Sequence, residues 1–289
     1  MIYLKRFEFP DEDAEVDFLI EIQRSCYDSF YPFKVLSANG FKTIEFEPIT
    51  ILYGGNGSGK TTALNVIADK IKIKRDAVYN KSNFYPDYVN MCSFLSLVNI
   101  PNKSRIITSD DVFDYMLSVR NINEGIDFKR DNLFAEHSEY TNPRGEYAGY
   151  QLKNLEDYDK FKRINETKRK TQSKFVRSNL KDNIREYSNG ENAYRYFIEK
   201  IEENALYILD EPENSLSPKR QIEVANFIKD SARFYNCQFI ISTHSPFFLA
   251  MEGAKIYDLD EYPVAVKQWT KLENVLTYHD FFKSHSGEF

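Results

Sequence analysis

A cluster of glycines is the feature that most restricts how this chain folds. Only 11 of the 289 residues are glycine, yet four of these lie between positions 54 and 59. A short run rich in β-forming residues, 48–53, precedes the cluster, and a stretch of helical composition, 62–68, follows it. The sequence therefore predicts a strand, a glycine turn and a helix in direct succession, as in an α/β fold.

The glycine turn and the residues after it match a phosphate-binding pattern, GxxxxGK[ST]. In this pattern backbone N–H groups and the helix N-terminus surround phosphates, the lysine reaches the β- and γ-phosphates, and the hydroxyl ligates Mg²⁺. The alternative, an ordinary glycine-rich turn, is disfavoured by the flanking strand and helix. We therefore expect a nucleotide site made of Gly54, Gly55, Asn56, Gly57, Ser58, Gly59, Lys60, Thr61 and Thr62, with Lys60 catalytic and Thr61 on Mg²⁺.

A second apolar run ends in two acids. Residues 205–209 are continuously apolar, as in a central parallel strand, and Asp210 and Glu211 follow them. Asp210 is expected to hold Mg²⁺ and Glu211 to orient or deprotonate the attacking water. A strand that merely ends in an acidic turn is the alternative. Since 150 positions separate Lys60 from Asp210, a sizeable insertion lies between the two strands.

Three further segments carry a family resemblance. The sequence Tyr-Ser-Asn-Gly-Glu at 187–191 resembles the signature motif of ATP-binding cassette (ABC) ATPases, in its S-x-G-E form. Residues 212–218 resemble the D-loop of that family, and 239–246 resemble its switch-histidine strand, with the histidine at His244. A lone histidine after an apolar strand more often packs than reacts. The order of all these elements favours a catalytic His244. The loops that follow parallel strands lie at one edge of the sheet, so His244 is expected near the other motifs.

The resemblance implies a P-loop ABC ATPase head, an α/β fold whose mixed or parallel sheet is flanked by helices. It implies ATP and Mg²⁺ as ligands, ATP hydrolysis with Lys60, Glu211 and His244 as catalytic residues, and a head-to-tail homodimer. In such a dimer the signature of one subunit, here Ser188, Asn189, Gly190 and Glu191, closes on ATP held by the other. The expected parts are an N-terminal lobe, 1–72, a mostly helical insertion, 73–186, and a lobe with signature, acids and switch, 187–289.

Within the family the motifs resemble the soluble group containing SMC, RecF and OLD-type ATPases, whose paired N-terminal strands are similar to 2–9 and 40–46. Small bacterial ATPases of this kind, some described as AAA ATPases, occur in genome-maintenance or phage-defence modules. The resemblance implies a nucleotide switch acting on nucleic acid or an effector protein. The alternative is an ATP-gated scaffold that holds a toxin or nuclease partner chain with little turnover.

Two positions depart from the group. Ser217 stands where the group often has a histidine before the D-loop proline, and no glutamine occurs between Thr61 and Tyr150 to act as the usual Q-loop ligand. The run 106–111 is a candidate to replace the missing Q-loop glutamine, since an acid there would reach the metal. Ser109 and Asp110, which lead into 112–117, also fit an ordinary helix N-cap, and we consider this the better interpretation.

Charge is unevenly distributed along the chain. The net charge is −6, but residues 153–185 hold 11 Lys or Arg against five acids, a local charge of +6. This segment is either a solvated helical face or a surface for DNA, RNA or an acidic partner. The insertion shows no heptad repeat, and its expected helices lie near 110–136 and 155–185.

Several classes are excluded by simple counts. The longest apolar stretches fall far short of the roughly 18 residues that cross a bilayer, and no signal peptide opens the chain, so we expect a cytoplasmic protein without a membrane contact. Cys26, Cys92 and Cys237 lack the spacing of a zinc site or a disulfide framework. After His244 we expect a strand near 255–259 and a helix around 269–282, with Trp269, His279 and His285 as packing or tail residues.

Overall fold

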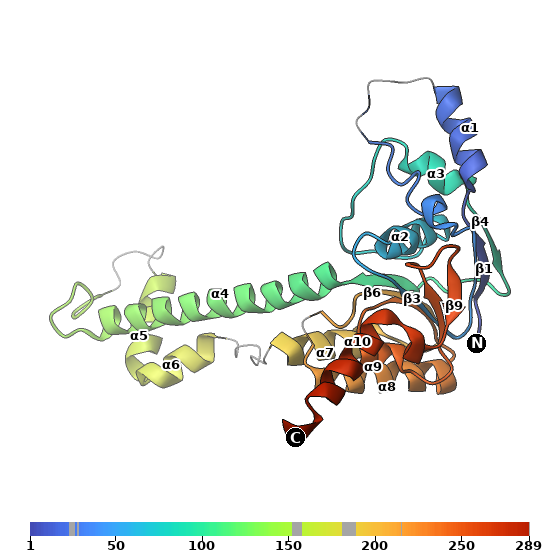
Figure 1. Ribbon diagram of the computed structural model, residues 1–289. Coiled ribbons are helices and arrows are strands. Elements are labelled where there is room, and N and C mark those ends of the chain that lie inside the picture. Colours follow the sequence, from blue (N-terminus) through green and yellow to red (C-terminus); the bar gives the residue numbers. More distant parts are fainter. Residues whose placement is uncertain (23–26, 28, 152–157, 181–188, 215, 289) are drawn as a thin grey trace. The chain divides into compact units, whose positions relative to one another are not determined.

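The computed structural model describes residues 1–22, 27, 29–151, 158–180, 189–214 and 216–288 (Figure 1). The chain forms two compact units. The first comprises residues 1–113 together with 188–289, and the second comprises residues 114–187. The α/β class expected from the sequence is confirmed, because the first unit is built on a largely parallel sheet with helices between its strands.

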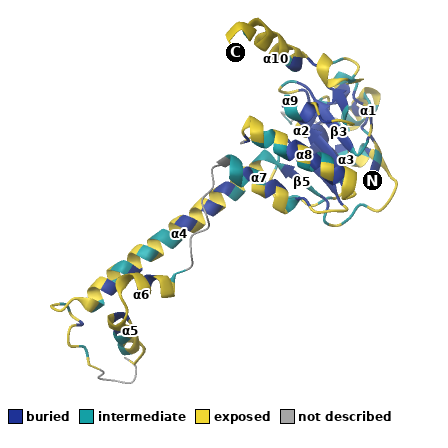
Figure 2. Cartoon of the chain, turned by 90° about the horizontal axis from the view of Figure 1, so that it is seen from below, coloured by how far each residue is buried: buried dark blue, intermediate teal, exposed yellow. Residues whose placement is uncertain are grey.

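The main sheet has six strands in the order β5-β6-β7-β3-β8-β9. All neighbouring strands pair in parallel except β8 and β9. Every residue of β3, β6 and β7 is buried, as the continuous apolar runs predict, and Figure 2 shows the strands around β3 in dark blue. The strands are β3 (Ile49–Tyr53), β5 (Arg105–Thr108), β6 (Leu206–Asp210), β7 (Gln238–Ser242), β8 (Lys255–Asp258) and β9 (Ala265–Lys267).

Helices of the first unit connect and cover these strands. Helix α2 follows β3 directly and buries every side chain from Thr62 to Ala68, because it lies in the middle of the unit. The helices are α1 (Glu12–Ile22), α2 (Lys60–Lys70), α3 (Tyr85–Met91), α7 (Asn189–Lys200), α8 (Pro218–Phe234), α9 (Pro246–Leu249) and α10 (Glu273–Ser284), with 3₁₀ turns η1 (Ser37–Asn39), η3 (Trp269–Lys271) and η4 (Ser286–Glu288).

A second, antiparallel sheet has the order β2-β1-β4. Its strands are β1 (Leu4–Glu8), β2 (Thr43–Glu45) and β4 (Ser93–Ser96). The pairing of β1 with β2 confirms the expected pair of N-terminal strands. Gln238 joins the two sheets: its side-chain oxygen accepts from the N–H groups of Tyr3 and Leu4 at 2.8 and 2.9 Å, and its nitrogen donates to Leu4 O at 2.8 Å and Glu47 O at 3.3 Å.

The second unit is helical. Helix α4 (Ser109–Thr141) is 33 residues long and continues from the first unit into the second, where α5 (Tyr158–Arg169) and α6 (Gln172–Asn179) follow. Leu133, Phe175 and Val176 form a small core. The single helix expected over 155–185 is wrong, because Thr171 is extended (φ −64°, ψ 153°) and separates α5 from α6.

Two further observations concern the described residues alone. Cys92 and Cys237 are buried thiols outside any disulfide, and Cys26 lies outside the described residues. Within the described ranges no helix combines the length and the apolar character that a membrane crossing needs.

Replacing Gln238 by Leu is expected to lower the free energy of unfolding by about 3 kcal/mol or more. The substitution leaves several buried backbone groups without the hydrogen bonds that Gln238 provides. Urea unfolding followed by circular dichroism measures the change. Gln268→Leu at an exposed position is the matched control. A loss for Gln238→Leu no larger than that of the control would contradict the bridging role of this side chain.

Candidate functional site

The glycine cluster forms a tight loop between β3 and α2. Gly57 and Gly59 have φ of +85° and +93°, a conformation that glycine adopts without strain. A Cβ on Gly59 would also lie only 2.9 Å from Leu36 Cδ2. The loop borders a cavity of about 370 Å³ that is lined by residues 56–62 together with Tyr31, Val35 and Glu211. Backbone N–H groups at the start of a helix thus face a cavity, as anion binding requires.

Lys60 is folded back over this loop. Its Nζ donates to Gly54 O at 2.7 Å and to Gly55 O at 3.0 Å, and the residue is 5% exposed. Burial lowers the pKa of Lys60, while the carboxylates of Glu211 and Asp210 act in the opposite direction. The ammonium group is therefore held at the wall of the cavity by two neutral carbonyl groups, which a phosphate oxygen is able to replace.

Thr61 and Asp210, the two expected magnesium ligands, lie side by side. Thr61 Oγ1 donates to Asp210 Oδ1 at 3.1 Å, and Ser242 Oγ donates to the same oxygen. Asp210 is 9% exposed. Burial raises the pKa of Asp210, and the hydrogen bonds from Ser242 and Thr61 oppose that rise. A hydroxyl beside a carboxylate suits Mg²⁺, which takes oxygen ligands and is usually held by one or two protein groups plus substrate phosphates.

Glu211 has a backbone conformation that is uncommon for its residue type. Its φ is +48°, and its N–H donates to both the carbonyl and the hydroxyl oxygen of Ser242 at 3.1 Å. Its Oε2 accepts from Asn214 Nδ2 at 3.1 Å. The turn at Glu211 brings its carboxylate to the wall of the cavity beside Lys60 and Thr61.

His244 lies across from Glu211. Its Nε2 is 3.6 Å from Glu211 Oε1, and that nitrogen is buried without a hydrogen-bond partner among the described residues. Its backbone N–H donates to Glu213 Oε1 at 2.6 Å, and its carbonyl accepts from Asn274 Nδ2 at 2.8 Å. Burial, followed by the charge of Lys60, lowers the pKa of His244, so a neutral imidazole faces the site at neutral pH.

Several residues of the site carry no motif. Asp260, after β8, accepts from the Gly55 N–H with its two oxygens at 2.8 and 2.6 Å. Tyr31 lines the cavity and donates to Thr62 Oγ1 at 3.1 Å. The rule that residues after parallel strands meet at one edge, applied to the strand expected near 255–259, would have placed Asp260 at this edge. No signal in the sequence points to Tyr31, which lies 23 residues before the glycine cluster.

The remaining candidates differ in outcome. Ser188 lies outside the described residues, and Asn189, Gly190 and Glu191 begin α7. The run 106–111 forms a helix cap: the Thr108 N–H and hydroxyl donate to Asp111 Oδ2 at 2.7 and 2.9 Å, and the Asp111 N–H donates to Thr108 Oγ1 at 3.4 Å. The helix start expected here is confirmed, but Thr108 and Asp111 make the capping contacts, not Ser109 or Asp110 as expected.

Family comparison agrees with this geometry. A family model described as ABC transporter matches residues 42–214, more than half of the chain, and one described as AAA ATPase domain matches residues 189–249. The chain belongs to the ABC transporter family. As an ABC-type ATPase domain it carries the family's phosphate-binding loop and acidic strand end within the matched range. No curated protein matches this chain.

Solved structures with similarity to this ABC domain are distant. An SMC head from Pyrococcus furiosus, bound to the C-terminal domain of ScpA, has TM-score 0.42 and 13% identity over 97% of this chain and 100% of that one. An SMC head from Thermotoga maritima has TM-score 0.39 and 13% identity over 92% and 99%. A dimeric ATP-binding cassette bound to ADP and Pi has TM-score 0.35 and 15% identity over 80% and 90%. At these scores the similarities carry no argument about assembly.

Asp210→Asn is expected to raise the stability of the nucleotide-free ABC domain by about 1 kcal/mol, as relief of a strained functional site usually does. The amide keeps an oxygen for Thr61 and Ser242 but removes a buried charge. The folded-state pKa of Asp210 is raised, so its ionisation destabilises the fold. The stability of Asp210→Asn relative to wild type should increase as the pH rises from the ordinary Asp pKa to the raised pKa of Asp210. Above the raised pKa the difference should stay constant.

Urea unfolding across this pH range measures the gain, with the exposed Asp230→Asn as control. An Asp210→Asn variant that is less stable than wild type at every pH would show that the carboxylate contributes to folding.

Proposed function

We propose that this ABC domain binds ATP with Mg²⁺ and hydrolyses the ATP in a head-to-tail homodimer, and that it acts as a nucleotide switch on nucleic acid or an effector protein. The observation that supports this best is that Lys60 and Glu211 both line the cavity that the glycine loop borders, and that His244 Nε2 lies 3.6 Å from Glu211 Oε1. A cation, a carboxylate and a neutral imidazole at one sheet edge are the groups that phosphoryl transfer to water uses.

The roles follow from the contacts. The loop N–H groups and Lys60 would hold the β- and γ-phosphates, with the Lys60 ammonium exchanging its two carbonyl contacts for phosphate oxygens. Thr61 and Asp210 would hold Mg²⁺, which offsets phosphate charge when bound. Glu211 would accept a proton from the attacking water, and the neighbouring His244 imidazole, whose Nε2 is 3.6 Å from Glu211 Oε1, would orient that water or contact the γ-phosphate.

A second copy is proposed because each chain has one glycine loop and one signature. The signature residues 188–191 would complete the site of the partner, as the family resemblance implies. The buried Nε2 of His244 supports a site that is completed on binding, since a buried polar atom without a partner is costly until something pairs with it.

The runner-up is a scaffold that binds ATP, turns it over negligibly and holds a toxin or nuclease chain. Glu211 and His244 favour hydrolysis over this scaffold, because a scaffold needs neither a base nor an imidazole placed 3.6 Å from that base. Action in genome maintenance or phage defence, and a cytoplasmic location, are parts of the proposal that rest on the motif resemblance.

Glu211→Gln should retain ATP and accumulate as a dimer with ATP and Mg²⁺, with phosphate release lowered at least 100-fold, because binding is kept while the base is lost. Lys60→Ala should lose nucleotide and remain monomeric. Sedimentation velocity and a phosphate-release assay measure both effects, with Glu252→Gln at an exposed position as control. A Glu211→Gln protein that stays monomeric would contradict the dimer. Wild-type protein that traps a partner without phosphate release would favour the scaffold.

Binding of DNA or RNA through 153–185 is a further part of the proposal. Some cations of this segment are already used inside the second unit: Arg163 pairs with Glu136, Lys168 Nζ donates to Tyr147 O at 2.6 Å, and Lys170 Nζ donates to Ser178 Oγ at 3.1 Å. Phe175 is buried in the small core and is not placed to stack on bases. The exposed cations that remain for phosphates include Lys162, Lys174 and Arg177.

Reversal of Lys162, Lys174 and Arg177 to Glu should weaken binding of a labelled duplex or single strand at least tenfold. It should also reduce the salt dependence, by about one slope unit for each phosphate contact that is lost. Fluorescence anisotropy over a salt series measures both quantities. Reversal of the exposed Lys74, Lys129 and Lys219 is the control with an equal change in net charge. Equal effects of the two triple variants would refute a specific role for this segment.

A further inference from the structure

Residues 34–39, here called the backing segment, lie outside the phosphate-binding motif but pack on the glycine loop. A Cβ placed on Gly59 would lie 2.9 Å from Leu36 Cδ2 and 3.2 Å from Val35 Cγ1, so these two side chains lie directly against that glycine. Val35 also lines the cavity that the loop borders. Gly59 is the N-cap of α2, with φ of +93°. The direction of the first N–H groups of α2 therefore depends on how the backing segment holds this glycine.

The backing segment has a conformation that depends on other contacts. Lys34 has φ of +62°, which is unfavourable for a residue with a Cβ and persists only where the surroundings hold it. The Lys34 N–H donates to Glu15 Oε2 at 2.6 Å, and the Ser37 hydroxyl donates to the same oxygen at 2.8 Å. At the other end of the segment, Asn39 Nδ2 donates to Ser58 O of the loop at 3.2 Å. One oxygen on α1 thus anchors a segment that contacts the glycine loop at two places.

Glu15 is buried where a carboxyl group is unfavourable for folding, since it is 0% exposed. On the same side of α1, Phe18 stacks on Phe33 with 4.9 Å between ring centroids, and Phe33 contacts Tyr88 of α3 edge to face. Burial raises the pKa of Glu15, and hydrogen bonds, first among them that of the Lys34 N–H, oppose the rise. A residue that is unfavourable for stability, yet anchors a wall of the site, is typical of a functional position.

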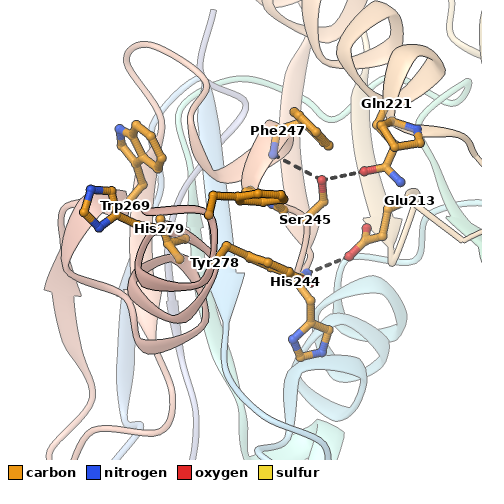
Figure 3. Close-up of a pocket in the computed structure, with 12 residues that line it drawn as sticks. Glu213, Gln221, His244, Ser245, Phe247, Trp269, Tyr278 and His279 are labelled. Carbon is orange, nitrogen blue, oxygen red and sulfur yellow. Dashed lines mark hydrogen bonds between the residues drawn. The ribbon is translucent and has the colours of Figure 1, made fainter. Parts of the chain in front are cut away.

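A second carboxylate has the same kind of contact. Glu213 Oε1 accepts from the His244 N–H at 2.6 Å and so fixes the backbone of the switch histidine (Figure 3). In both places a carboxylate binds a backbone N–H of a neighbouring segment, and that segment presents its own groups to the site. Hydrogen bonds to an ionised group are about twice as strong as neutral ones, which suits them to holding backbone in one conformation.

We propose that Glu15 is a positioning residue of the nucleotide site: it anchors the backing segment, which in turn holds Gly59 and the start of α2 in the conformation that binds phosphate. The inference rests on the proposed function, because it concerns the loop that would hold ATP. A loop rich in glycine has many conformations available, and its apparent affinity falls with the fraction of molecules in the binding conformation. Glu15 raises that fraction from outside the cavity.

Two substitutions of Glu15 separate the acceptor oxygen from the volume of the side chain. Glu15→Leu removes the acceptor and stays apolar, whereas Glu15→Gln keeps an acceptor oxygen. ADP with Mg²⁺, titrated by calorimetry, is the probe, because it brings phosphates to the loop and is not hydrolysed. Glu15→Leu should raise the dissociation constant of ADP at least about tenfold, and Glu15→Gln less than about threefold. In the nucleotide-free protein, amide hydrogen exchange of residues 54–62 should be faster in Glu15→Leu than in wild type.

Gln238→Leu is the matched control. It destabilises the first unit at the start of β7, whereas the site lies beside Ser242 at the end of that strand. Its affinity for ADP should equal that of wild type, and urea unfolding gives the stability of every variant. ADP affinity that follows stability in Gln238→Leu and Glu15→Leu alike would show a merely structural role and overturn the proposal.

Other outcomes also decide the matter. Unchanged ADP affinity and exchange in Glu15→Leu would overturn the positioning role and leave the proposed function standing, as would equal losses in Glu15→Gln and Glu15→Leu. Wild type that binds no ADP, together with faster exchange of 54–62 in Glu15→Leu, would refute the nucleotide function and support the positioning role. Should Glu15→Leu not fold, Ser37→Ala removes one of the two donors and should raise the ADP dissociation constant about threefold. An unchanged constant in Ser37→Ala would then overturn the proposal.

Discussion

The parallel register of four strands is the constraint on which the rest of this ABC domain depends. Thr108, Asp210, Ser242 and Leu52 are aligned across β5, β6, β7 and β3, so each strand reaches the same edge at the same level. Because Asp210 lies opposite Ser242, the serine hydroxyl donates to its carboxylate, and the next residue, Glu211, donates its N–H back to Ser242. A shift of one residue in any pairing would turn these side chains to the other face of the sheet.

The edge of this sheet gathers features that are unfavourable for folding. One small region holds a buried carboxylate, a lysine whose pKa burial lowers, a left-handed Glu211 and an imidazole nitrogen that no described residue hydrogen-bonds. The fully buried strands β3, β6 and β7 offset this cost with apolar burial on both faces. This arrangement is typical of enzymes. Apolar burial inside the sheet stabilises the fold, and the sheet edge holds charged and strained groups that are unfavourable for stability.

Local patterns explain which parts of the site were predictable. Lys60 and Thr61 belong to one continuous motif, and Asp210 and His244 follow apolar runs whose common edge follows from parallel pairing. Tyr31 and Asn274 hydrogen-bond residues of the site but belong to no motif or periodic pattern. The sequence therefore offers no basis for finding them. The break at Thr171 has no signal in the sequence, because 155–185 has continuous helical polarity, whereas the fold there depends on the packing of Phe175 and Val176 against Leu133.

The bridge made by Gln238 has a consequence for the order of events during synthesis. Tyr3 and Gln238 are separated by 235 positions, so the first strand emerges from the ribosome long before the residue that anchors it. At about 5–20 residues per second, β1 waits on the order of ten seconds or more before the Gln238 side chain is able to bind its backbone. During that interval β1 is able to pair with β2 and then with β4, but the N–H groups of Tyr3 and Leu4 still lack the side chain that accepts from them. The start of β1 is thus among the last parts of the first unit to be fixed, although it is among the first to be made.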